Sequence, residues 1–215
     1  MPVSTQVLAL RQLLAERFPS ARRAAAGVLA TGLRGLDEPA GGGLPLGAVT
    51  ELVCAAPSCG GQLILGQLLA VTRAQRRRVA LVDCTDTFDP ASFPPDQLAH
   101  LVWVRGNGTV TAALAATDLL ARDANLGLVV LDLRAAPLAE LRRTPGTLWY
   151  RLQRAVEDTD LALVVQSPQP IVSSAQLRLE LTHPLDPAGL DQERPALLPQ
   201  VQPTVGRQRL NAAAG

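Results

Sequence analysis

The feature that most constrains the fold is an alternation of short, continuously apolar segments with longer amphipathic ones. The segment "LGLVVLDL" has no charged residue before Asp132. Strands that helices bury on both faces have this composition, whereas a strand with one wet face alternates. We therefore predict strands at 48–54, 79–84, 101–106, 126–133 and 161–167, and helices at 60–78, 110–124 and 147–159. This order is typical of an α/β fold with a parallel, twisted sheet between helices.

The regions on either side of these segments have other patterns. Residues 175–183, "AQLRLELTH", alternate, so they predict a half-exposed strand nearer an edge of the sheet. Residues 31–47 are rich in glycine and predict turns. From residue 184 onward, Pro, Gln and Ala are frequent and no period is firm, which predicts an irregular tail with one strand near 197–205. We divide the chain into a docking helix and linker (1–30), a core (31–183) and a C-terminal tail (184–215).

The N-terminal segment 4–18 has a helical apolar stripe formed by Val7, Leu10, Leu14 and Phe18. Ser4 or Thr5 can cap this helix and Pro19 ends it. Such a stripe either packs on the helix's own domain or docks on another protein, and we predict docking.

Composition narrows the chemistry. All 20 basic residues are Arg, so a reaction that needs a lysine amine is excluded. The net charge of +1 provides no strong field for nucleic acid or an anionic membrane. Three cysteines, Cys54, Cys59 and Cys84, lack paired metal-ligand spacing, so we expect buried thiols and no metal site. Neither a signal peptide nor a membrane span is apparent, and we expect a cytoplasmic protein.

In a parallel sheet, ligands bind at the carboxyl ends of the strands. Here those ends are Cys54, residues 83–86, residues 132–134 and residues 166–168. The first is followed by "CAAPSCGGQ" (54–62), which has the glycines and the position of a phosphate-binding loop. Such a loop reads G-x-x-x-x-G-K-[ST], where the lysine reaches phosphate and the hydroxyl holds magnesium. In this chain the lysine position is Gly60 or Gly61, and the hydroxyl position is Gly61 or Gln62.

Several segments together resemble the core of RecA-type ATPases. They are "TGLRGLDEPAGGGLPLGAVTEL" before the loop, "VALVDCTDTFDP" (79–90), "LGLVVLDL" (126–133) and "LALVVQS" (161–167). The resemblance covers about residues 31–182. It implies that Asp132 ends the Walker B strand, that Gln166 is the nucleotide-sensing glutamine, and that Thr85 stands where the family has its catalytic glutamate.

The resemblance therefore implies a nucleotide site that has lost its function. A threonine cannot act as the general base, and a loop without lysine and hydroxyl loses most of the electrostatic stabilisation of phosphoryl transfer. We expect no enzymatic activity, no cofactor and no small-molecule substrate. Asp132 and Gln166 are then vestigial, as is the degenerate loop, which consists of Ala55, Ala56, Pro57, Ser58, Cys59, Gly60, Gly61 and Gln62.

Among RecA-like proteins with a degenerate loop, the chain resembles the ImuA type, through "APSCGGQL" (56–63), its length and its N-terminal helix. ImuA-type proteins are accessories of SOS-induced translesion DNA synthesis. The resemblance implies an adaptor that contacts RecA, an ImuB-like polymerase subunit, or both. Alternatives are a SulA-like division inhibitor that binds FtsZ, and a RecA-family protein that binds ATP.

Recombinases bind DNA through two loops. The equivalents here are 134–146, with Arg134, Arg142 and Arg143, and 168–175, which is short and uncharged. This departure argues against a DNA filament and leaves at most a weak DNA contact. Arg207 and Arg209 in the tail form a second candidate docking patch.

Overall fold

The structure is a computed structural model, and it describes residues 27–189 and 191–209. The predicted docking stripe of Val7, Leu10, Leu14 and Phe18 lies outside these residues and stays a prediction.

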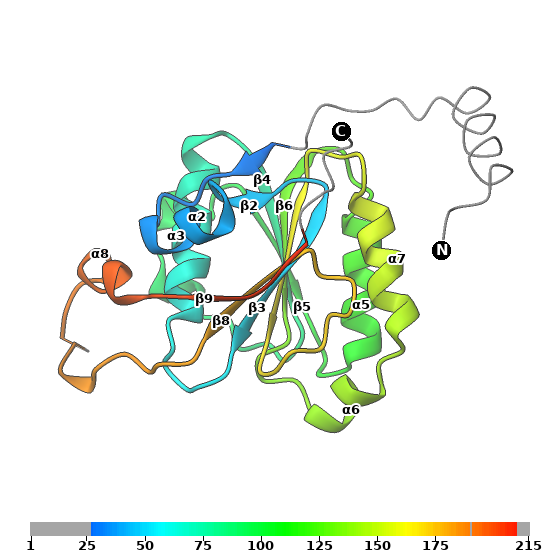
Figure 1. Cartoon of the computed structure of the whole chain (residues 1–215). Helices are drawn as coiled ribbons and strands as arrows, with labels where there is room; N and C mark the ends of the chain where they lie inside the picture. The colour runs from blue at the N-terminus through cyan, green and yellow to red at the C-terminus, as the bar shows by residue number, and fades with distance from the viewer. Residues whose placement is uncertain (1–26, 190, 210–215) are drawn as a thin grey trace, which may run out of the picture.

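A seven-stranded sheet forms the centre of the molecule (Figure 1). Every neighbouring pair is parallel except β8 and β9, which are antiparallel. In spatial order the strands are β5 (Leu101–Arg105), β4 (Arg78–Asp83), β6 (Leu126–Asp132), β7 (Ala162–Ser167), β3 (Ala48–Cys54), β8 (Leu177–Leu181) and β9 (Thr204–Gln208). The predicted α/β class with a mostly parallel central sheet is confirmed.

Helices cover both faces of this sheet (Figure 1). The helices α2 (Arg34–Ala40) and α3 (Gly61–Ala74) pack on one face, and α5 (Val110–Leu120) and α7 (Gly146–Val156) pack on the other. The smaller elements are β1 (Val28–Leu29) paired with β2 (Leu44–Pro45), the short helices α4 (Pro95–Leu98), α6 (Leu138–Arg143) and α8 (Arg194–Leu197), and the 3₁₀ turns η1 (Pro90–Ser92), η2 (Pro187–Gly189) and η3 (Leu198–Gln200).

The pleat of the strands divides the core into two apolar layers. In β4, Val79 and Leu81 join the layer under α2 and α3, while Ala80 and Val82 join the layer under α5 and α7. Successive side chains point to opposite faces of a sheet, so a strand covered on both faces must be apolar at every position. This is why the continuous apolar segments of the sequence become the inner strands.

Two expectations for the first half of the chain need correction. Residues 31–47, predicted as turns, include helix α2, because the carboxylate of Asp37 accepts hydrogen bonds from the N–H groups of Thr31 and Gly32 and orders the turn before it. The helix predicted over 60–78 ends at Ala74. Arg76 adopts a left-handed conformation (φ 55°), which turns the chain so that β4 can begin at Arg78.

The expected irregular tail is wrong for residues 204–208. They form β9, which pairs with β8 and closes one edge of the sheet, and a short helix, α8, precedes it. The predicted strand at 197–205 was therefore placed too early. The composition conceals this strand because its side chains are mostly exposed and provide no apolar alternation.

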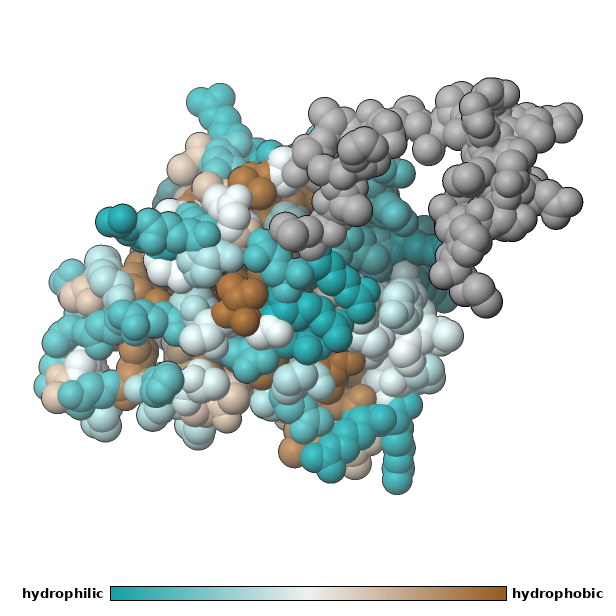
Figure 2. All heavy atoms as spheres, in the orientation of Figure 1, coloured by the Kyte–Doolittle hydropathy of each residue, from teal (hydrophilic) through white to brown (hydrophobic). Residues whose placement is uncertain are grey.

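Within residues 27–189 and 191–209, no helix has the length and apolar character needed to cross a membrane. On the face that Figure 2 shows, apolar atoms of the described residues reach the surface in small patches separated by polar ones. Among the described residues, the large apolar side chains with substantial exposure each lie on a different helix or strand. They are Val28, Val102, Leu119, Leu138, Tyr150 and Val205. Scattered single residues of this kind are normal for a protein surface and do not by themselves mark an interface.

Candidate functional site

The order of the strands brings the predicted site residues together at the carboxyl ends of three inner strands. Because β6, β7 and β3 are neighbours, Asp132, Gln166 and the loop after Cys54 lie side by side. The ladder continues past the strand ends, since the N–H of Leu133 donates to the carbonyl of Gln166 (2.9 Å). The strand ends named from the sequence therefore lie next to one another.

The loop of residues 55–60 is held in place by the protein itself. The N–H of Ala55 donates to Leu181 of β8 (3.1 Å), and the carbonyl of Ser58 accepts from the N–H of Leu185 (3.0 Å). Ser58 and Gly60 both have positive φ, 53° and 97°, which gives the loop the compact turn from which α3 begins. A side chain at Gly60 would also collide with Val201, whose methyl carbon would lie 2.7 Å from the new Cβ.

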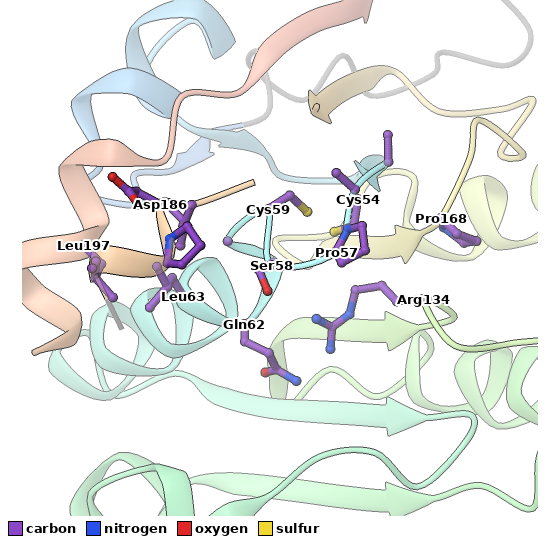
Figure 3. Close-up of a pocket in the computed structure, with 17 residues that line it drawn as sticks. Cys54, Pro57, Ser58, Cys59, Gln62, Leu63, Arg134, Pro168, Asp186 and Leu197 are labelled. Carbon is purple, nitrogen blue, oxygen red and sulfur yellow. The ribbon is translucent and has the colours of Figure 1, made fainter. Parts of the chain in front are cut away.

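The loop forms one wall of a cavity of about 690 Å³ (Figure 3). Arg134 and Pro168 line it from the ends of β6 and β7, and residues 185–189 and Leu197 of the C-terminal segment line the opposite side. This volume falls within the range of small-molecule pockets, which is roughly 300–1,000 Å³. The residues from 185 onward, expected to be an irregular tail, therefore contribute directly to the candidate site.

Asp132 is bonded to a residue of its own loop. Its carboxylate accepts hydrogen bonds from the Nε of Arg134 (2.9 Å), from the Nη2 of Arg134 and from the N–H of Arg134 (3.0 Å). Asp132 is buried, and the guanidinium is mostly buried. Burial lowers the pKa of Arg134, but the ion pair with Asp132 outweighs it and raises that pKa overall. The remaining nitrogen, Nη1, borders the loop, since it would lie 3.2 Å from a Cβ added at Gly61.

Gln166 is fully buried and contacts the loop from beneath. Its Nε2 donates to the carbonyl of Gly61 (3.1 Å). Its Oε1 has no hydrogen-bond partner among the described residues, and the same is true of the Oε1 of Gln62. Gln166 therefore supports the first turn of α3 rather than facing the cavity.

Two thiols meet inside the loop. The thiol of Cys54 donates to the carbonyl of Leu52 (4.0 Å), and Figure 3 shows the side chains of Cys54 and Cys59 on the inner side of the turn. The Cys54 thiol beside it lowers the pKa of Cys59; burial opposes this effect and backbone N–H groups of the loop reinforce it, so that the pKa is lowered overall. The neighbouring Cys59, together with burial, raises the pKa of Cys54. The amides that would surround a phosphate in a phosphate-binding loop therefore stabilise a sulfur of the loop. Burial of Cys59 and Cys84 is as predicted, whereas Cys54 is only half-buried.

Thr85 lies one strand further along, in the loop after β4. The buried carboxylate of Asp83 orders this loop by accepting from the N–H groups of Thr87 (3.1 Å) and Phe88 (2.8 Å). The adjacent Asp86 is directed away from the cavity, because it forms a bidentate ion pair with Arg105 of the edge strand β5 (2.8 and 2.6 Å). That ion pair lowers the pKa of Asp86.

These residues do not fit a magnesium–nucleotide complex. Such a complex needs a lysine and a hydroxyl in the loop and a carboxylate that is free to face the metal. The loop offers glycine and glutamine at those positions, and the carboxylate of Asp132 already accepts three hydrogen bonds from Arg134. A cation beside Asp132 would also be repelled by that guanidinium. Among the described residues there is no group of three or more His, Cys, Asp or Glu that could hold a metal ion.

The two loops compared with DNA-binding loops differ in structure. In the first, Arg142 and Arg143 lie at the end of α6, while Arg134 is folded back onto Asp132. The second, 168–175, is fixed by the buried carboxylate of Glu51, which accepts from the N–H groups of Ile171 (2.6 Å) and Val172 (2.9 Å).

Arg207 and Arg209, predicted as a docking patch, also bind this second loop. Arg207 Nη1 and Arg209 Nη2 both donate to the carbonyl of Ser173, at 3.1 and 3.3 Å. Each guanidinium group therefore makes a hydrogen bond within the chain.

Two features of this edge were missed from the sequence. One is Glu51, which pairs with Arg178 of β8 (Nε–Oε2 2.6 Å); a single charge inside an apolar strand was the available signal, because such a charge must find a partner. The other is the contact between Cys54 and Cys59. Its signal was the five-residue spacing across a turn, which brings the two ends of the loop together.

No protein-family model matches the chain, and a search of curated proteins finds no match either. The function is therefore argued from the residues and their arrangement.

Proposed function

We propose that the chain is a non-catalytic, RecA-like adaptor of the ImuA type, which acts in SOS-induced translesion DNA synthesis by contacting RecA, an ImuB-like polymerase subunit, or both. The arrangement of the sheet is consistent with a RecA-like layout. The loop after β3, Gln166 at the end of β7 and Asp132 at the end of β6 share one edge, as the resemblance requires.

The observation that carries the proposal is the bond between Asp132 and Arg134 beside a loop that lacks lysine. In a phosphoryl-transfer site the carboxylate and the positive charge act on the metal and the phosphates. Here they neutralise each other within three residues of sequence, and the side chain of Asp132 is only 3% exposed. A RecA-like fold with this site is suited to binding other proteins and not to phosphoryl transfer.

The direct test is binding of the purified full chain to purified partners from its own organism. RecA on single-stranded DNA, the ImuB-like subunit and FtsZ would each be immobilised and titrated with the chain. The proposal expects saturable binding to RecA or the ImuB-like subunit and none to FtsZ. Binding to FtsZ alone would instead assign the chain to division control.

The N-terminal stripe provides the matched variants for this test. Leu10→Asp with Leu14→Asp places two charges on the stripe, and Ala9→Asp with Gln12→Asp places two charges on the opposite face of the predicted helix. We expect the first variant to lose at least tenfold in partner affinity and the second to bind as the parent chain does. Equal binding by both variants, with unchanged circular dichroism, would remove the stripe from the proposal.

Nucleotide binding is tested separately by thermal unfolding with magnesium and ATP. A ligand at one hundred times its dissociation constant stabilises a protein by about 2.7 kcal/mol. The proposal expects no shift of the melting temperature up to millimolar ATP. A clear shift would favour the alternative of an ATP-binding RecA-family protein.

A further inference from the structure

Cys54 and Cys59 form a pair of thiols at the wall of the cavity. Cys54 is the last residue of β3 and Cys59 directly precedes the N-cap of α3, so the turn between them brings their side chains together (Figure 3). Both residues line the cavity, and 5% of the surface of Cys59 is exposed. A small, uncharged reagent that enters the cavity can therefore reach the pair.

The surroundings of the pair favour negative charge on Cys59. The N-terminus of the 14-residue helix α3 begins two residues beyond it, and a helix N-terminus stabilises an anion. A Cβ added at Gly61 would lie 2.8 Å from the Cys54 sulfur and 3.2 Å from Arg134 Nη1, which places the guanidinium near the Cys54 member of the pair. Helix N-termini and neighbouring arginines are the environments that make a cysteine reactive.

The two cysteines are not equivalent. The neighbouring Cys54 thiol and backbone N–H groups of the loop lower the pKa of Cys59, whereas burial opposes them. The Cys54 thiol donates to the carbonyl of Leu52 (4.0 Å), and its neighbour Cys59 together with burial raises its pKa, so that it stays protonated. The pair thus has a nucleophilic sulfur and, next to it, a neutral thiol.

We propose that Cys59 and Cys54 form a redox-active site, at which a hydroperoxide oxidises Cys59 and Cys54 then closes an intramolecular disulfide. This inference goes beyond the proposed function and does not depend on it. The oxidant class is a small peroxide, because Cys59 is only 5% exposed and its sulfur needs to reach only a terminal peroxide oxygen.

The reaction balances in two steps. The Cys59 thiolate attacks a peroxide oxygen, the O–O bond breaks, and hydroxide (or alkoxide) leaves and takes a proton from water, which gives a sulfenic acid. The Cys54 sulfur then attacks the sulfur of that acid, the S–O bond breaks, and the hydroxyl leaves with the thiol proton as water. The peroxide is reduced by two electrons and the two thiols are oxidised to one disulfide.

Cys84 is an internal control. It is fully buried, and burial together with the charges of Glu140, Asp132 and Asp83 raises its pKa to about 11. Trypsin separates it from the pair, since residues 35–73 contain Cys54 and Cys59 without an internal Arg or Lys, and residues 79–105 contain Cys84.

The experiment treats the reduced full chain with one equivalent of hydrogen peroxide at pH 7, blocks the remaining thiols with N-ethylmaleimide, and analyses tryptic peptides by mass spectrometry. We expect peptide 35–73 to be two hydrogens lighter and unlabelled, and peptide 79–105 to carry one label. Free thiols in peptide 35–73, equally fast loss of Cys84, or a disulfide between two chains would each overturn the proposal.

Two isosteric variants separate the roles. In Cys54→Ser the sulfenic acid at Cys59 should persist and be trapped by dimedone, whereas Cys59→Ser should slow the oxidation of Cys54 at least tenfold. The initial rate in the parent chain should fall as the pH is lowered, because protonation removes the Cys59 thiolate. The other titratable or charged groups at the cavity are Cys54, Asp186 and Arg134, which is paired with Asp132. Equal rates for the two serine variants, both folded by circular dichroism, would contradict the assignment of the nucleophile.

Discussion

Among the described residues, two arginine pairs with a buried carboxylate lie near the carboxyl ends of the strands, and they differ in what they connect. Glu51 and Arg178 are 127 residues apart in sequence, and Glu51 is fully buried. Asp132 and Arg134 are two residues apart, and the arginine borders a cavity. The same pair of chemical groups therefore fixes tertiary structure in one place and defines the charge of a site in the other.

The hydrogen bonds explain the difference. The carboxylate of Glu51 accepts from Ser167 Oγ, the N–H groups of Ile171 and Val172, and Arg178 Nε, so it joins three segments of the chain. Among the described residues, the carboxylate of Asp132 is hydrogen-bonded only to Arg134. An ion pair between residues two apart in sequence joins no distant segments of the chain. Its main effect is therefore on the charge at the wall of the cavity.

The largest expected effect is that of Glu51→Gln. Loss of one partner from a buried ion pair costs about 3–5 kcal/mol, because the other charge is left buried and unpaired. We expect a decrease of this size in the free energy of unfolding measured in urea. Amide hydrogen exchange at Ile171 and Val172 should accelerate as well.

The control for this variant is Glu38→Gln, which removes an exposed ion pair with Arg34 on α2. An exposed pair contributes less than about 1 kcal/mol. Similar losses of unfolding free energy for the two variants would mean that the buried ion pair of Glu51 stabilises the fold no more than an exposed one. Adding Arg178→Met to Glu51→Gln should recover part of the lost stability, because no unpaired charge then remains.

Asp132→Asn should have a smaller effect, a loss of about 1–3 kcal/mol, which is the cost of an incompletely paired buried polar group. The guanidinium of Arg134 can turn towards the cavity and regain water, which Arg178 cannot do as easily. Urea unfolding measures the loss, and exchange at Ile171 and Val172 should stay as in the parent chain. Faster exchange there would show that the two pairs are coupled.

The smallest effect is expected for Asp118→Asn, at about 1 kcal/mol near pH 7. Asp118 of α5 is bonded to Arg151 of α7 (2.6 Å) and to Arg122 (3.0 Å), and both arginines are largely exposed. Burial raises the pKa of Asp118, but the hydrogen bonds from the arginines outweigh it and lower that pKa overall.

The sign of the pH dependence follows from this lowered pKa. The charged form is favoured in the folded state, so the stabilisation is complete above the pKa of the unfolded chain, about 3.9, and is lost as the pH falls below it. The difference in unfolding free energy between the parent chain and Asp118→Asn should be constant from pH 7 to 5 and shrink progressively as the pH falls below about 3.9 towards the lowered pKa of the folded state. A difference that does not shrink at all in acid would assign the effect to packing instead of charge.

The sequence allowed prediction of the inner strands and of the edge where the site lies, because burial on both faces requires apolar residues at every position of a strand such as β6. It did not reveal β9, whose exposed side chains have no such requirement. The partners of Glu51 were equally hidden. Each depends on which distant segments become neighbours, and the order of strands in a parallel sheet is decided by packing rather than by local pattern.

The position of β3 also has a consequence for synthesis of the chain. Its two neighbours in the sheet are β7 and β8, and its last residue, Cys54, pairs with Leu181. At a translation rate of about 5–20 residues per second, roughly 6 to 25 seconds separate the synthesis of these two residues. Until β7 has been synthesised, which takes most of that interval, β3 lacks both of its strand partners, and a nascent chain that ends before β7 cannot form the cavity at all. An inner strand of the finished sheet is therefore paired late, and the interval is the period in which the chain depends most on protection from aggregation.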